Sequence, residues 1–341
     1  MTRHNRRMGW RGALASLALV VGMMPLVATA AEGGNWLNAM AEEQGTVQQV
    51  EPGKPEMAVP AEGPAKAIPG LGLAVDYAMV SDYIWRGQNF SEWSGEGREA
   101  LNHQVGFTVS VDTSEAFGMN LGTFSGNVWF EFYADQDNAR RMGPADRNQD
   151  CTLQEVDYTI DWTYGVTEFM DVSVGHIWYH FPQSEGDDRM TNEWYVGLSF
   201  DDTELWKMCG IDFNLNPTIA YYIDVDNADY GQWIIAGLSH EFVMSEMGMQ
   251  DVPVLKDTTL TPSVQFHFDH RYLNTNRTTK LSSINYQLDI AVDLSSALEI
   301  PAEWGGFSVG GFLAYSQAVD DGAAAGISDE FYGGMNVGWE W

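Results

Sequence analysis

From Leu71 to the C-terminus, apolar and polar residues alternate with a period of two, almost without a break. In the clearest run, residues 156–164, aromatic or aliphatic residues occupy the even positions and Asp or Thr the odd ones. Successive side chains of a β-strand point to opposite faces, so each such run predicts a strand with one apolar and one polar face. This pattern favours an all-β fold and argues against a helical one.

The alternating runs predict about twelve strands, an even number, as single-chain bacterial membrane barrels have. Tight connections follow the even-numbered strands, as at Asp112–Gly118, and longer polar ones follow the odd-numbered strands, as at Asp135–Thr152. This asymmetry is typical of periplasmic turns and outer loops, and it places both termini in the periplasm. The predicted strands are 71–79, 105–111, 128–132, 156–164, 171–181, 193–201, 217–226, 230–242, 260–272, 283–294, 306–318 and 330–341.

The N-terminal region predicts export. Residues 1–30 combine a basic start, an apolar stretch from Ala13 to Val27 and an Ala28-Thr29-Ala30 cleavage pattern, as in a secretory signal peptide. Residues 31–69 are rich in Ala, Glu, Pro and Gly without alternation, which predicts a flexible periplasmic leader. No later segment approaches the roughly 20 apolar residues of a spanning helix. We therefore expect residues 70–341 to form a transmembrane antiparallel up-and-down β-barrel.

Composition supports a barrel and excludes some partners. The chain has 13 Trp, 14 Tyr and 16 Phe, and its hydrophobic residues are spread thinly rather than in blocks. Its formal net charge of −31 makes nucleic acid and anionic lipid poor partners. A secreted β-sandwich remains the alternative, because alternation alone does not separate a lipid-facing surface from a sandwich core.

The last strand predicts recognition by the barrel-assembly machinery, and hence residence in the cell outer membrane. It ends on an aromatic carboxyl terminus and carries large apolar residues on one parity, as the closing strand of a bacterial outer-membrane barrel does. We expect this face to be the assembly signal and to contact outer-membrane lipid; its residues are Phe331, Met335, Val337, Trp339 and Trp341.

The opposite parity predicts an acidic lumen. Carboxylates at inward positions far outnumber the inward bases, so we expect a wet pore that passes small solutes and prefers cations. The alternative is a non-conducting structural or adhesive barrel, filled by side chains or by the leader. The expected pore-lining residues are Asp76, Glu131, Asp157, Asp161, Asp224, Asp269, Asp289, Asp293 and Glu340.

The sequence supports a hydrolase site, a metal site or a disulfide less well than it supports a pore. Ser239-His240 and His267 supply residue types for a hydrolase, but a lone barrel histidine is more often a polar lumen residue. Acidic clusters such as Asp224–Asp229 resemble solvated loops more than calcium sites, so we expect no metal ion and no cofactor. Cys151 and Cys209 are expected at opposite ends of the barrel, about 30 Å apart and too far for a disulfide.

The end of the first strand resembles a known family. Residues 80–89 read Val-Ser-Asp-Tyr-Ile-Trp-Arg-Gly-Gln-Asn and are similar to the Ser-Asp-Tyr-x-aromatic-Arg-Gly opening of the TorF-type porins, outer-membrane proteins of poorly defined function. The resemblance implies a barrel and a pore but no substrate; this chain is longer than that group and adds the leader. Taken alone, the same residues predict Tyr83 and Trp85 in an interfacial girdle, Arg86 at headgroups and Gly87 in a turn.

Overall fold

The computed structural model describes residues 69–91, 101–133, 153–182, 190–211, 213–226, 230–273, 279–319 and 327–341. The predicted signal peptide lies outside these residues, as does the leader except for its last residue. Within the described part of the chain, no helix is long and apolar enough to cross a membrane.

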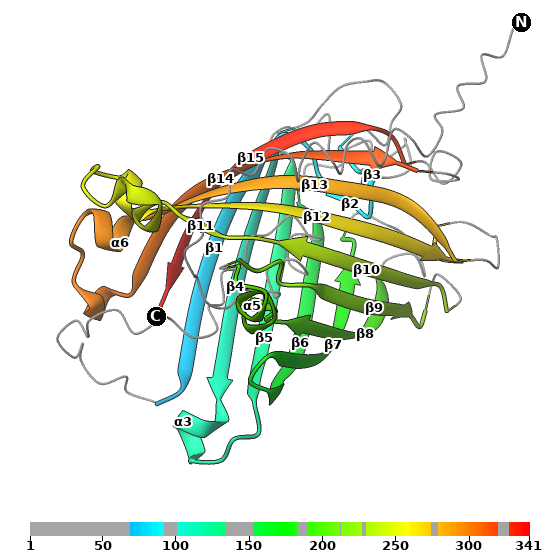
Figure 1. Ribbon diagram of the computed structural model, residues 1–341. Helices are drawn as coiled ribbons and strands as arrows, with labels where there is room; N and C mark the ends of the chain where they lie inside the picture. Colours follow the sequence, from blue (N-terminus) through cyan, green and yellow to red (C-terminus); the bar gives the residue numbers. More distant parts are fainter. Residues whose placement is uncertain are drawn as a thin grey trace, which may run out of the picture.

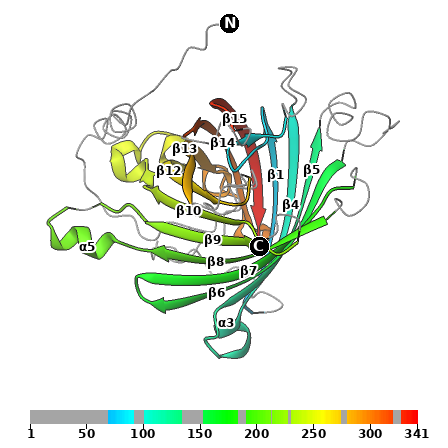
Figure 2. The same ribbon diagram turned by 90° about the vertical axis from the view of Figure 1, so that its right-hand side faces the viewer.

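The described chain forms a closed antiparallel β-barrel of twelve long strands, which confirms the predicted fold class (Figures 1 and 2). Each strand pairs with its neighbours in sequence, and the barrel closes where β1 pairs with β15. The two-residue β11 (Phe242–Val243) continues the path of β10 along β12. The twelve strands are β1 (Leu71–Val80), β4 (Asn102–Asp112), β5 (Thr123–Tyr133), β6 (Leu153–Thr167), β7 (Met170–His180), β8 (Met190–Phe200), β9 (Thr218–Asp224), β10 (Gln232–Ser239), β12 (Thr258–His270), β13 (Lys280–Asp293), β14 (Gly306–Ala318) and β15 (Glu330–Glu340).

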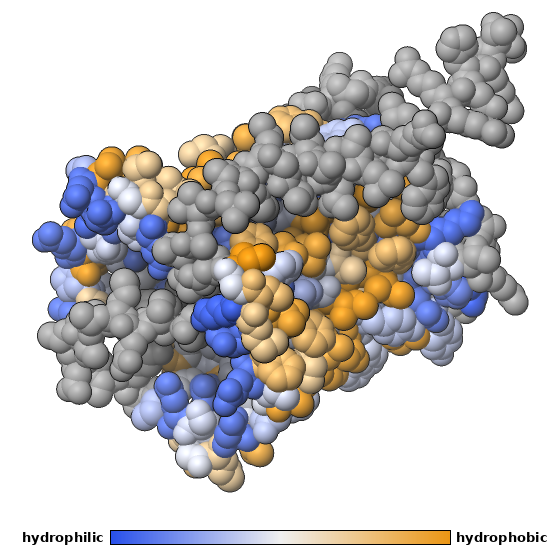
Figure 3. Space-filling view, in the orientation of Figure 1, coloured by the Kyte–Doolittle hydropathy of each residue, from blue (hydrophilic) through white to orange (hydrophobic). Residues whose placement is uncertain are grey.

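The outer surface of the barrel is apolar. On β6, Tyr158 and Ile160 are 43% and 52% exposed, whereas Asp157 and Asp161 on the opposite parity are buried inside. Other strands expose Phe107, Val196 and Leu313 in the same way. On the face that Figure 3 shows, hydrophobic residues lie across the middle of the barrel and hydrophilic residues lie toward both ends. Exposing this much apolar surface disfavours a water-soluble sandwich and suits a lipid environment.

One end of the barrel carries short helical turns together with the C-terminus (Figure 1). Here the backbone of Trp341 exchanges two hydrogen bonds of 2.8 Å with that of Leu73, so the end of the chain is joined to the first strand. Cys209 lies just after α5, where its thiol is exposed and free; Cys151 lies outside the described residues. The helical elements are α3 (Thr113–Phe117), α5 (Thr203–Met208), η3 (Ser245–Met249), η4 (Leu255–Asp257), α6 (Leu294–Ala297) and η5 (Ala302–Trp304).

The last strand presents its apolar parity to the outside. Phe331, Met335 and Val337 are 70%, 61% and 47% exposed, while Trp339 and Trp341 are half-buried near the helical turns. The indole of Trp339 donates a hydrogen bond of 2.7 Å to the carbonyl oxygen of Trp304. Four residues of the predicted assembly signal thus share one parity of β15, and the fifth, Trp341, follows the strand as the last residue.

Candidate functional site

A short hairpin after β1 lies inside the barrel. Strands β2 (Ile84–Trp85) and β3 (Gln88–Asn89) pair with each other and with no barrel strand. Between them Arg86 and Gly87 have φ of 51° and 80°, the two positive values of a type I′ turn. A Cβ on Gly87 would lie 2.8 Å from Ser283 Oγ, so only glycine fits where the tip meets β13. We call residues 81–91 the inner hairpin.

The inner hairpin overturns one interpretation from the sequence. Tyr83, Trp85 and Arg86 are 2%, 9% and 1% exposed, so they belong neither to an interfacial girdle nor to a headgroup contact. Tyr83 packs on the inward-facing Trp129, and Trp85 on Tyr179. Burial of these large rings against the inner wall favours the inward conformation over exposure to solvent.

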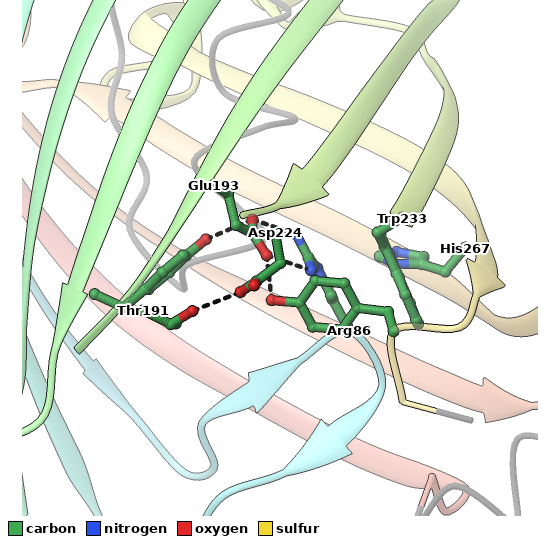
Figure 4. Close-up of polar contacts among 8 residues, drawn as sticks. Arg86, Thr191, Glu193, Asp224, Trp233 and His267 are labelled. Carbon is green, nitrogen blue, oxygen red and sulfur yellow. Dashed lines mark hydrogen bonds and ion pairs between the residues drawn. The ribbon is translucent and has the colours of Figure 1, made fainter. Parts of the chain in front are cut away.

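Arg86 forms an ion pair across the lumen with Glu193 of β8 (Figure 4). Its Nη1 and Nη2 each donate to one carboxylate oxygen at 2.8 Å, and both side chains are 0% exposed. Counting around the barrel from β1, which carries the hairpin, β8 is the fifth strand in one direction and the seventh in the other. The hairpin therefore reaches nearly the opposite wall.

Two tyrosines complete the coordination of Glu193. The hydroxyl of Tyr179 donates to Oε2 at 3.1 Å, and that of Tyr272 donates to Oε1. A buried carboxylate with a bidentate guanidinium and two hydroxyl donors has its charge and its lone pairs satisfied. Removing one member of such a pair typically costs about 3–5 kcal/mol, because it leaves the other charge buried alone.

Aromatic rings enclose the guanidinium. Its Cζ lies 4.4 Å from the ring centre of Trp85, 5.0 Å from Tyr222, 5.3 Å from Trp233 and 4.3 Å from Tyr272. These distances are within the range of cation–π attraction, worth about 0.5–2 kcal/mol per contact. We call Trp85, Tyr222, Trp233 and Tyr272 the aromatic cage.

His267 lies beside the cage as a neutral hydrogen-bonding residue. Its Nδ1 accepts from Trp233 Nε1 at 3.2 Å, and its Nε2 lies 3.2 Å from Gln265 Oε1. An acceptor at Nδ1 and a donor at Nε2 correspond to a single neutral tautomer. The histidine thus orients Trp233 and adds no positive charge to the lumen. Of the serine–histidine pair considered for a hydrolase, His240 contacts Asn214 in the connection between α5 and β9.

Most of the predicted pore-lining carboxylates occupy inward positions, and several have structural partners. Asp161 accepts from Tyr195 and Thr163, Asp224 accepts from Thr191, and Asp269 accepts from two backbone amides after β12. Asp289 and Glu340 lie on the inward parity and are partly exposed. Buried at inward positions are Asp76, Glu131, Asp157, Asp161, Asp224 and Asp269.

The expectation for Asp293 was wrong. Its side chain is exposed and accepts from the backbone amide of Ser296, so it caps α6 at the end of the wall instead of lining the lumen. A carboxylate that begins a helix is stabilised by the free amide groups there, and alternation within β13 does not reveal that the strand ends.

Two buried acids of the barrel wall were missed from the sequence, Glu155 and Glu193. Glu155 precedes the predicted fourth strand and lies beside a β-bulge that shifts the register with β5. Glu193 opens the predicted strand 193–201 and is followed by Trp194 on one parity and Tyr195 on the other, so hydrophobicity alone does not say which face is inward. The signal available was the inward parity shared by Glu193, Tyr195 and Ser199.

The interior changes character along the barrel axis. At the loop end it is filled by the hairpin and by buried rings such as Trp129, Tyr179 and Trp233. At the turn end, where the short helical elements lie, the inward residues include small, partly exposed ones: Ser110, Ser125, Ser239, Ser263, Ser308 and Gly310. The hairpin and these buried rings therefore occupy the interior at the loop end.

Among the residues that the structure describes, no three His, Cys, Asp or Glu side chains are grouped so that they could hold a metal ion. Asp229, at the end of the acidic cluster weighed as a calcium site, lies outside those residues.

Comparison with known proteins gives structural likenesses only. No protein-family model matches the chain, and no curated protein does. Among solved structures, the KdgM porin aligns at 8% identity over 78% of this chain and 98% of its own, with a TM-score of 0.40. An outer-membrane channel from Pseudomonas putida F1 aligns at 9% identity over 84% and 100%, with a TM-score of 0.43. The NanC porin aligns at 11% over 78% and 97%, with a TM-score of 0.38. Because these TM-scores lie below 0.5, the likenesses carry no argument about function.

Proposed function

We propose that the protein is a porin-like channel of the outer membrane that passes small solutes, prefers cations, and is narrowed by the inner hairpin. The observation that carries this proposal is the charge of the interior. Among the buried residues that the structure describes, nine are Asp or Glu, and the single Lys or Arg is Arg86.

The charge imbalance acts on permeating ions through electrostatics. Carboxylates along a water-filled path within a low-dielectric wall attract cations and repel anions. Arg86 pairs with Glu193, so a single positive charge faces nine buried acidic residues in the part of the chain that the structure describes. The small, partly exposed side chains at the turn end support a path into the barrel from that side.

Conductance across a planar bilayer tests the proposal. With the refolded protein in a KCl gradient, the reversal potential is expected to have the sign for K⁺ over Cl⁻. Selectivity is expected to weaken in concentrated salt, because the Debye length falls from about 10 Å at 0.1 M to about 3 Å at 1 M. An anion-selective or unselective channel in dilute KCl would contradict the acidic-pore argument.

A second candidate function is a non-conducting structural barrel. It is favoured by the packing of the inner hairpin, since Tyr83, Trp85 and Trp129 fill the loop end. Absence of conductance, in the wild-type protein and in a variant with the inner hairpin replaced by a short Gly-Ser turn, would favour this candidate over the channel.

The outer face supports the proposed membrane partners. Its exposed apolar residues on β6 and β15 suit contact with outer-membrane lipid, and the exposed parity of β15 suits recognition by the barrel-assembly machinery. Both assignments are part of the proposal, and Met335→Asp, which places a charge on this face of β15, tests them.

A further inference from the structure

The surroundings of Arg86 come mostly from the barrel wall. Glu193 lies on β8, Tyr222 on β9 and Trp233 on β10, and Tyr272 follows β12; Trp85 is the one cage ring that the hairpin supplies. If the hairpin withdraws, the carboxylate and three rings stay in place. A buried carboxylate then faces an aromatic-lined space without its cation.

We propose that this carboxylate and the aromatic cage form a binding site for small solutes that carry a guanidinium group, with Arg86 as a tethered occupant that such a solute displaces. The inference deepens the proposed channel by naming a solute class, and its transport aspect rests on that function. Binding itself does not require conductance.

The geometry selects a guanidinium over other cations. Both carboxylate oxygens of Glu193 accept from one planar group at 2.8 Å, a bidentate arrangement that an ammonium ion cannot reproduce. Tyr179 and Tyr272 hold the carboxylate in place by donating to its two oxygens. The ring faces at 4.3–5.3 Å suit a flat, weakly hydrated cation.

Arg86 is a displaceable occupant because of how it is held. It lies at the tip of a hairpin whose strands are two residues each, and its φ of 51° is unfavourable for a residue with a Cβ. A ligand on a short tether competes at an effective concentration in the millimolar range. Free guanidinium solutes should therefore occupy the site of the wild-type protein only at millimolar concentrations or above.

Binding of methylguanidinium to Arg86→Ala tests the site directly. The variant removes the tethered cation and leaves Glu193 and the wall. Titration followed by tryptophan fluorescence should give saturable binding at least tenfold tighter than in the wild type, because Trp233 lines the site. Methylammonium, with the same charge but no planar fork, should bind at least tenfold more weakly than methylguanidinium.

The double variant Arg86→Ala/Glu193→Gln is the matched control, because it keeps the cage and removes the carboxylate. Equal binding in the single and double variants, or equal binding of methylguanidinium and methylammonium, would overturn the proposal. If Arg86→Ala folds only when methylguanidinium is present, that rescue supports the site, provided that methylammonium does not rescue it.

Gly87→Val gives a second way to empty the cage should Arg86→Ala fail to fold under every condition. Its side chain would collide with Ser283 and displace the hairpin tip, so it should also bind methylguanidinium more tightly than the wild type. No gain in binding by folded Gly87→Val would count against the proposal. Conductance is recorded separately: binding without conductance refutes the channel and keeps the site, whereas cation-selective conductance without binding refutes the site alone.

Discussion

The first prediction is that Glu193→Gln releases the inner hairpin. The substitution keeps the shape of the side chain but leaves the Arg86 guanidinium buried without its counter-charge. Truncating one partner of a buried ion pair costs about 3–5 kcal/mol. The hairpin can avoid this cost by moving Arg86 into water, because residues 84–89 form a sheet of their own outside the barrel ladder.

The size of the shift follows from these energies. A change of 1.4 kcal/mol alters an equilibrium about tenfold, so even 3 kcal/mol would raise the withdrawn population by about a hundredfold. The aromatic cage attracts the guanidinium equally in the wild type and in the variant, so it does not offset the loss of the counter-charge. We therefore expect the hairpin to spend much more time outside the loop end of the lumen.

Single-channel recording measures this shift. Glu193→Gln should show larger conductance steps, or longer times at the higher level, than the wild type. Glu131→Gln is the matched control, because Glu131 is also 0% exposed and inward-facing but is bonded to Asn102 on the neighbouring strand. If the two variants gave the same conductance pattern, the Arg86–Glu193 pair would not control the hairpin, and the reasoning would fail.

Three further predictions test the pore, the register and assembly. Asp157→Asn combined with Asp161→Asn should move the reversal potential in dilute KCl toward zero while the barrel stays folded, and an unchanged potential would remove these residues from the ion path. Cysteine at position 160 should react with a lipid-soluble reagent and cysteine at 161 with a water-soluble one; the reverse pattern would mean that the register is wrong. Met335→Asp places a charge on an outward position that is 61% exposed, which costs up to a few kcal/mol on the lipid face, so it should lower the heat-modifiable folded fraction in membranes; normal assembly would argue against a lipid-facing β15.

The strands were predictable because lipid and lumen impose opposite demands on alternate residues. In β6 the apolar parity is outside and the acidic parity inside, so alternation alone gave both the element and its facing. The same rule failed at strand ends. Asp293 continues the inward parity of β13, yet it serves as the N-cap of α6, because its carboxylate accepts a hydrogen bond from a backbone amide of the first helical turn.

The inner hairpin could not be predicted by the same reasoning. Tyr83 and Trp85 are aromatic residues at the end of a strand, a composition shared by interfacial girdles. A type I′ turn is usually signalled by Asn-Gly or Asp-Gly. Here its first position is Arg86, and the ion pair with Glu193 offsets the cost of the positive φ of that residue. That ion pair joins residues 107 positions apart, so no local pattern contains it.

Hairpin position and ion selectivity should be coupled, because Arg86 is the single buried Lys or Arg among the described residues. Withdrawal of the hairpin removes one positive charge from the loop end of the lumen and leaves Glu193 behind, so the withdrawn state should prefer cations more strongly. Gly87→Val, which displaces the tip without changing any charge, should then raise both the conductance and the K⁺ preference. Glu193→Gln should raise the conductance with little change in K⁺ preference, since it removes one negative charge as Arg86 leaves. If Gly87→Val widened the channel but made it less cation-selective, the carboxylates of the wall would not be the source of the selectivity.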